Sequence, residues 1–132
     1  MDALDRPVAK PRPVYLNLLA IRQPLPAVVS ILHRISGALL FLIGIPFLLW
    51  VVQRALASPD AWAQMRAALA HPIAKLALLA LAWAYFHHFL AGIRHLVMDL
   101  HVGMDLPSAR RSGALVLVLA VVLTLAVAVK LW

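Results

Sequence analysis

Apolar residues divide the chain into three long hydrophobic runs separated by short polar stretches. The runs cover Val28–Val52, Leu76–Ile93 and Gly113–Val129. A helix rises ~1.5 Å per residue, so about 20 apolar residues cross a bilayer core of ~30 Å. An unpaired strand in lipid would leave its backbone groups without hydrogen bonds. The runs therefore predict an all-α integral membrane protein with three transmembrane helices. These helices are expected at about residues 28–53, 72–99 and 112–131.

Proline and polar residues mark the segments outside the helices. Residues 1–26 hold five prolines and are expected to form an extended cytoplasmic arm, which leaves residues 27–132 as a three-helix membrane anchor domain. Pro46 lies inside the first run and is expected to kink its helix. The first connection opens with Ser58-Pro59-Asp60, an arrangement typical of a helix start, and predicts a short amphipathic helix. The second connection is expected at about Leu100–Ser112.

Composition strengthens the membrane interpretation. The chain is 64% hydrophobic and 13% charged, whereas soluble domains are about 45–50% apolar and about 25% charged. A water-soluble chain of 132 residues has too little interior for so many apolar side chains, which disfavours a soluble enzyme or a DNA-binding domain. The 12 basic residues lie between the apolar runs and form no cluster, so no nucleic-acid partner is expected. The absence of cysteine excludes disulfides and thiolate-bound metal on this chain.

The positions of lysine and arginine predict the orientation. Positive residues favour the cytoplasmic side of a membrane. The N-terminal arm, the start of the first helix and the second connection hold Arg6, Lys10, Arg12, Arg22, Arg34, Arg94, Arg110 and Arg111. The opposite side holds Arg54, Arg66, Lys75 and Lys130. The N-terminus is therefore expected in the cytoplasm.

Polar residues near the start of the first helix form one candidate site. Ser30 and Arg34 are four residues apart and share a helix face, and His33 lies beside them. One interpretation is that Arg34 extends to lipid headgroups while the serine bonds to its own helix. The other is a polar pocket in which the hydroxyl donates to a carbonyl oxygen and the guanidinium stabilises developing negative charge.

The second helix carries a stripe of polar and small residues. His88, Gly92, His95 and Asp99 fall on one face, whereas His87 points about 100° away. A lone membrane histidine commonly bonds to a neighbouring helix. Imidazole is also a common axial ligand of haem iron, and a glycine on the same face lets a flat macrocycle approach. Because only His88 is well placed, a six-coordinate haem would need a histidine from another subunit.

Two motifs resemble a known family. The first is Arg12-Pro13-Val14, then Leu18, then Ser30-x-x-His33-Arg34-x-Ser36-Gly37. The second is His88-x-x-x-Gly92-Ile93-Arg94-His95-x-x-Met98-Asp99. In this order and spacing the chain resembles the cytochrome b556 membrane-anchor subunit of bacterial succinate dehydrogenase from Arg12 to its C-terminus. His101, where the family usually has a small residue, departs from the pattern and affects only the loop.

The resemblance implies a heterotetramer in the bacterial inner membrane. Its flavoprotein subunit oxidises succinate, its iron–sulfur subunit relays electrons, and two anchor subunits share haem b and bind ubiquinone. By position, His88 is the axial haem ligand of this chain, and Ser30 and Arg34 belong to the quinone site. His33, Arg34 and His95 lie near the haem propionates or in the layer behind the ligand. The chain is then a non-flavin subunit of an enzyme, with no complete active site of its own.

Three other interpretations predict different observations. A cofactor-free membrane scaffold or assembly protein would use its histidines only for bonds between helices and would have no cytochrome spectrum. A transporter subunit would carry ionisable residues near mid-membrane on several helices, but the third run has none between Arg111 and Lys130. A fumarate reductase anchor would work in the reverse direction, which an anchor sequence does not determine.

Overall fold

The computed structural model describes residue 17 and residues 20–132, and in this part of the chain all regular secondary structure is helical. Three helical spans are long and apolar enough to cross a membrane: Leu25–Ala57, Pro72–Asp99 and Leu106–Leu131. A shorter helix, α3 (Pro59–Leu69), joins the first span to the second. The predicted fold class is thus confirmed. Most of the predicted N-terminal arm lies outside the described residues.

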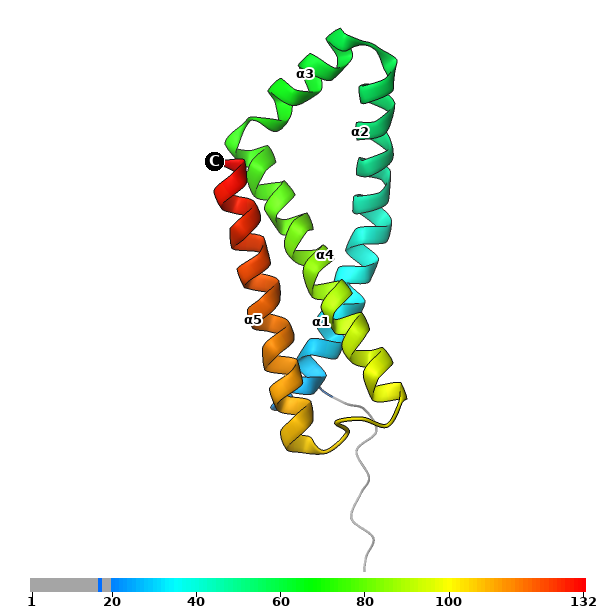
Figure 1. The fold of residues 1–132 in the computed structure, drawn as a ribbon, viewed down its shortest axis with the longest axis vertical. Helices are drawn as coiled ribbons and strands as arrows, with labels where there is room; N and C mark the ends of the chain where they lie inside the picture. Colours follow the sequence, from blue (N-terminus) through cyan, green and yellow to red (C-terminus); the bar gives the residue numbers. More distant parts are fainter. Residues whose placement is uncertain (1–16, 18–19) are drawn as a thin grey trace, which may run out of the picture.

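The first span changes direction part-way along its length. It consists of α1 (Leu25–Leu39), a π-helical turn η1 (Leu40–Gly44) and α2 (Ile45–Ala57). Pro46 lies in the first turn of α2 and has no N–H to donate, so the regular bonding pattern cannot pass through it. The Ile45 N–H instead bonds to the Leu40 carbonyl, which closes the wider turn. The irregularity therefore lies just before the proline, and α1 and α2 point in different directions (Figure 1).

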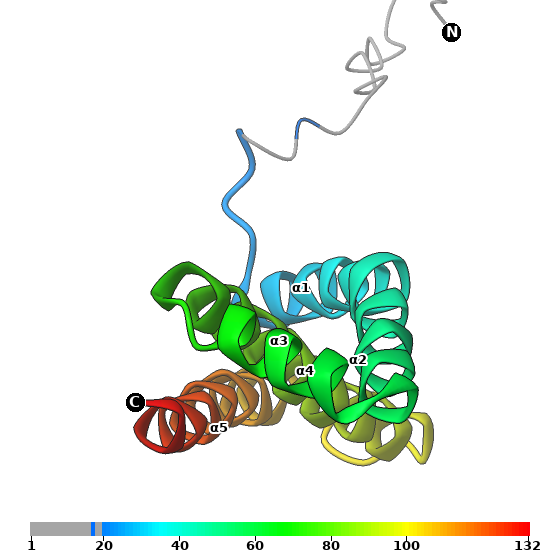
Figure 2. The ribbon, with the colours of Figure 1, turned by 90° about the horizontal axis from the view of Figure 1, so that it is seen from above.

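The shorter helix α3 follows from its first three residues. The Ser58 side chain accepts a hydrogen bond from the Ala61 N–H at 3.1 Å, while Pro59 and Asp60 occupy the first turn. Such an N-cap typically contributes about 1 kcal/mol to helix stability. The helix crosses one end of the molecule between α2 and α4, as Figures 1 and 2 show. The amphipathic helix predicted in the first connection is therefore confirmed.

The third span begins before its apolar run. Helix α5 (Leu106–Leu131) starts with Asp105 as its N-cap, whose carboxylate accepts the Ser108 N–H at 3.0 Å. This hydrogen bond lowers the pKa of the Asp105 carboxyl. With Pro107 also in the first turn, the helix starts at Leu106, ahead of the start expected at about residue 112. The connection is therefore shorter than the hydrophobic pattern predicts.

Helix α4 (Pro72–Asp99) packs against both α1 and α5, and lies between α5 and α2 in Figures 1 and 2. The core is small: Val29, Ala91 and Val116 are buried together, one from each helix. Helix α5 packs against α1 at Gly113, where an added Cβ would make an ordinary contact of 3.5 Å with Val29 Cγ2. Only 11% of the most apolar window of α5 is buried, so most of its side chains face outward. This surface suits lipid or other subunits rather than water.

Candidate functional site

Three histidines meet where α1 crosses α4. His33 comes from α1, and His88 and His95 come from α4. The rings of His33 and His88 are stacked, with centroids 4.2 Å apart and an interplanar angle of 8°. The ring centroids of His33 and His95 are 5.1 Å apart, with the rings tilted. The structure therefore brings together the three histidines that the sequence singled out on two separate helices.

One ring nitrogen of His88 is fixed by the backbone of α1. His88 Nδ1 lies 3.0 Å from the carbonyl oxygen of His33, and 3.4 Å from Ser36 Oγ. A carbonyl oxygen only accepts hydrogen bonds, so Nδ1 carries the proton and donates it. In the neutral ring this leaves a free lone pair on Nε2. His88 is thus held in the tautomer that presents Nε2 to a ligand.

The second ring nitrogen of His88, Nε2, has no partner in the part of the chain that the structure describes. Nε2 makes no hydrogen bond with the described residues, and the side chain is only partly buried. An imidazole whose second nitrogen bonds to a backbone carbonyl is the usual arrangement behind a metal-binding histidine. The arrangement can therefore supply one axial nitrogen to a group shared with another subunit.

Of the two glycines beside the histidines, only Gly37 is needed for their close approach. A Cβ added at Gly37 would lie 2.7 Å from His88 Cε1, closer than real contacts allow. A Cβ added at Gly92 would lie 3.6 Å from His33 Nε2, an ordinary contact. Gly37 therefore allows the His88 ring to lie against α1. The sequence predicted that Gly92 admits a macrocycle; in the structure its neighbour is the His33 ring.

His87 differs sharply from the adjacent His88. Its side chain is 0% exposed and lies against the backbone of Val29 and the ring of Trp83, whose centroid is 5.1 Å from its own. Neither ring nitrogen reaches a hydrogen-bond partner in the described part of the chain. A histidine enclosed among the helices of its own chain cannot bind a group shared with another subunit. Of the two neighbours, His88 is the residue placed for ligation.

Ser30 and Arg34 lie on α1 beside the histidine cluster but do not join it. Ser30 is partly buried and Arg34 is exposed, and neither side chain bonds to a described residue. Asp99, at the end of the predicted stripe on α4, is exposed as well. The serine and the arginine are therefore free to bind a molecule at the surface of this chain.

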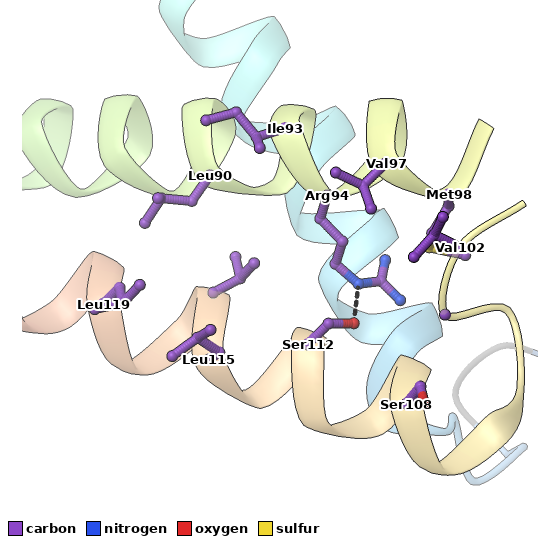
Figure 3. A pocket seen from close by; sticks show the side chains of 12 residues that line it. Leu90, Ile93, Arg94, Val97, Met98, Val102, Ser108, Ser112, Leu115 and Leu119 are labelled. Atoms are coloured by element: carbon purple, nitrogen blue, oxygen red, sulfur yellow. Dashed lines mark hydrogen bonds between the residues drawn. The ribbon is translucent and has the colours of Figure 1, made fainter. Parts of the chain in front are cut away.

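Arg94 is buried, although the sequence counts it among the basic residues at the cytoplasmic boundary. It lies inside α4, within the helix predicted at about residues 72–99, and is only 7% exposed. Its Nε donates to Ser112 Oγ at 3.0 Å, as Figure 3 shows. One Nη donates to the Ala109 carbonyl at 3.3 Å. A buried guanidinium needs such partners because desolvation of a charge is costly. Arg94 therefore joins α4 to α5 instead of marking a membrane boundary.

Arg94 also borders an apolar groove between α4 and α5. The groove has a volume of about 340 Å³, and Leu90, Val97, Leu115 and Leu119 contribute to its walls (Figure 3). Ser30, Arg34 and His88 are not among its lining residues. The groove and the histidine cluster are therefore separate features of the molecule.

The donor set of the cluster fits a haem rather than a bare metal ion. Among the described residues, no group of three or more His, Cys, Asp or Glu side chains could hold a metal ion. Haem iron needs only axial ligands from protein because the porphyrin supplies the equatorial ones. One oriented imidazole at the chain surface meets that requirement.

Fold and site together define a multi-pass helical membrane protein that presents an oriented histidine at its surface. Residues 8–127 match the family described as succinate dehydrogenase/fumarate reductase transmembrane subunit. The chain belongs to this family of oxidoreductase subunits, and the resemblance seen in its motifs is confirmed.

Similar proteins from three bacteria carry the name succinate dehydrogenase cytochrome b556 subunit. The protein from Coxiella burnetii is 37% identical over 122 residues, covering 92% of this chain and 97% of its own. The one from Paracoccus denitrificans is 34% identical over 112 residues, or 85% of each chain. The one from Rickettsia prowazekii is 26% identical over 126 residues, which cover 95% of this chain and 97% of the Rickettsia protein. This chain is thus similar to membrane-anchor subunits over nearly its whole length.

Proposed function

We propose that this chain is a membrane-anchor subunit that binds haem b and helps to form the ubiquinone-reduction site of a succinate:quinone oxidoreductase. One observation carries the proposal: His88 is fixed through Nδ1 by the His33 carbonyl at 3.0 Å, and Nε2 is left free. The names of the similar proteins, which include cytochrome b556, support a haem at this position.

In this proposal His88 would hold the haem iron from this chain, and a histidine of a second anchor subunit would hold it as well. When bound, haem supplies reversible one-electron chemistry, while the protein supplies position and electrostatic field. His33 and His95 flank His88 and are suited to contact the propionates or to support the ligand. Haem also links the two subunits, because neither provides both ligands.

Ser30 and Arg34 form this chain's share of the quinone site. The Ser30 hydroxyl donates to one carbonyl oxygen of the quinone, and the Arg34 guanidinium stabilises the charge that the ring gains on reduction. Both side chains are free of partners among the described residues, as a binding role requires. The rest of the pocket comes from the second anchor and the iron–sulfur subunit. Protons enter from the cytoplasmic side, where the pocket opens.

The orientation follows from where the helices place the basic residues. One end of the molecule holds the start of α1, the end of α4 and the start of α5 (Figure 1). Basic residues near this end, together with those of the N-terminal arm, outnumber the four at the other end, so this end faces the cytoplasm. The protein is then a multi-pass subunit of the bacterial inner membrane, with its N-terminus in the cytoplasm.

Purification of the native complex tests the proposed assembly. With an affinity tag on the C-terminus of this chain, detergent extraction should recover a flavoprotein, an iron–sulfur protein and a second small membrane subunit. The preparation should reduce ubiquinone with succinate. Recovery of this chain without a dehydrogenase would contradict the proposal and favour a cofactor-free scaffold.

Gly37→Ala tests the approach of His88 to α1. The new Cβ would meet His88 Cε1 at 2.7 Å, so the imidazole must move away from the His33 carbonyl. Overpacking of this kind costs about 1–3 kcal/mol. We expect a lower haem content per complex, measured from the reduced spectrum, and a lower unfolding temperature. Gly44→Ala is the control, since its Cβ would meet the flexible end of Leu40 at 3.3 Å and Leu40 Cβ at an ordinary contact distance of 3.7 Å. Equal haem content in both variants would show that Gly37 has no such role.

A further inference from the structure

The carbonyl oxygen of His33 is shared by two side-chain donors. Ser36 Oγ lies 3.0 Å from it, as does His88 Nδ1, and Oγ and Nδ1 are 3.4 Å apart. Because the oxygen only accepts, the serine hydroxyl and the imidazole N–H both donate to it. Ser36 is 2% exposed, so water does not replace these bonds. The three groups form a compact triangle behind the free nitrogen of His88.

Two donors at one oxygen compete for its electron density. The 3.4 Å contact between Oγ and Nδ1 is too long for a strong hydrogen bond, so the hydroxyl acts mainly through the carbonyl. A stronger Nδ1–H···O bond makes the opposite nitrogen a better electron donor to a metal. The hydroxyl therefore weakens that bond and limits the basicity of Nε2.

We propose that Ser36 is a positioning residue that adjusts the reduction potential of the haem through the His33 carbonyl and His88. This inference rests on the proposed function, in which His88 ligates haem iron. Second-layer hydrogen bonding is one of the means by which a protein sets the potential of a haem. Loss of the hydroxyl strengthens donation from Nε2, which favours ferric iron and lowers the potential.

A purely structural role for Ser36 predicts a different result. Serine and threonine in membrane helices often bond to a carbonyl of their own helix with no further consequence. Thr124 provides this case in α5, where its Oγ1 donates to the Ala120 carbonyl at 2.7 Å. Within the described residues, its hydroxyl bonds to this carbonyl and to no member of the histidine cluster. Thr124→Val is therefore a matched control that removes one hydroxyl bonded within its own helix.

The test is a redox titration of the haem in the purified whole complex, comparing Ser36→Ala, Ser36→Thr and Thr124→Val with the unmodified protein. Ser36→Ala should change the reduction equilibrium about threefold toward the ferric form, which is about 28 mV at 59 mV per tenfold change. Ser36→Thr retains the hydroxyl and should restore the potential, while Thr124→Val should leave it unchanged.

The haem content and the reduction potentials of these variants decide whether the inference about Ser36 holds. Loss of haem in Ser36→Ala but not in Ser36→Thr would overturn the inference, since the hydroxyl would then hold the ligand in place instead of limiting its basicity. An intact spectrum with an unchanged or higher potential in Ser36→Ala would overturn it. So would the same shift in Thr124→Val or in Ser36→Thr. A normal haem spectrum in a His88→Ala complex would instead refute the proposed function, on which the inference about Ser36 rests.

Discussion

Replacing His88 by alanine is expected to abolish the low-spin haem spectrum of the complex. The substitution removes the imidazole whose Nδ1 donates to the His33 carbonyl and whose Nε2 is left free. No neighbouring side chain takes its place: His33 stacks beside it, and His87 is enclosed within the helices. The reduced-minus-oxidised spectrum of the purified complex measures the effect. Haem should be lost, or should change to a form that lacks one axial ligand.

His87→Leu is the matched control for this experiment. It removes the adjacent imidazole, whose nitrogens have no hydrogen-bond partner among the described residues, and it nearly keeps the volume of the side chain. Replacing an unsatisfied buried polar group by an apolar one of similar volume is nearly neutral or stabilising. The spectrum should therefore persist. A low-spin spectrum in His88→Ala that matches the unmodified complex would refute the ligand assignment.

Arg34→Leu is expected to reduce ubiquinone reduction by about ten- to a hundredfold. A hydrogen bond to a charged group contributes about 1.5–3 kcal/mol, and 1.4 kcal/mol corresponds to a factor of ten. Arg34 is exposed and makes no bond to a described residue, so its loss should not disturb the fold of this chain. Succinate oxidation with an artificial dye does not use the quinone site and should remain close to normal. The ratio of the two activities is the measurement.

Arg110→Leu provides the comparison for Arg34→Leu. Arg110 is an exposed arginine in the first part of α5, at the same end of the molecule. Its replacement removes a positive charge from that end without touching α1, and both activities should remain near normal. If Arg34→Leu lowers the dye and quinone activities equally, the variant is misassembled and Arg34 has no special place at the quinone site.

The fold was largely predictable because a backbone in lipid must form its hydrogen bonds within the protein. Long apolar runs must become helices, and Ser58-Pro59-Asp60 encodes the start of α3 by local chemistry alone. The start of α5 was harder to predict because Asp105 and Pro107 begin the helix ahead of its apolar residues. The π-helical turn before Pro46 is a local response of the backbone that hydropathy does not show.

The candidate site was predictable only in its residue types. Spacing on α4 indicated His88, because His88, Gly92 and His95 share one face. The bond from His88 to the His33 carbonyl depends on how α1 crosses α4, which one helix period does not reveal. Ser36 and Gly37 were visible in the first motif, three and four residues after His33, but their roles required the neighbouring helix.

Arg94 shows the same limit of sequence reasoning. At the end of an apolar run a charged residue indicates a membrane boundary. In the structure its partners are Ser112 and the Ala109 carbonyl, both on α5. Only the packing of α4 against α5 brings these groups together, so its burial could not be inferred from α4 alone.

The reduced-minus-oxidised optical spectrum of the native complex, purified through this chain, tests the central claim most directly. If His88 and a histidine of a second anchor hold haem b between them, the spectrum will contain a Soret band and the sharp α and β bands of a low-spin cytochrome b. A colourless complex that still contains both anchor subunits and the dehydrogenase would contradict the account.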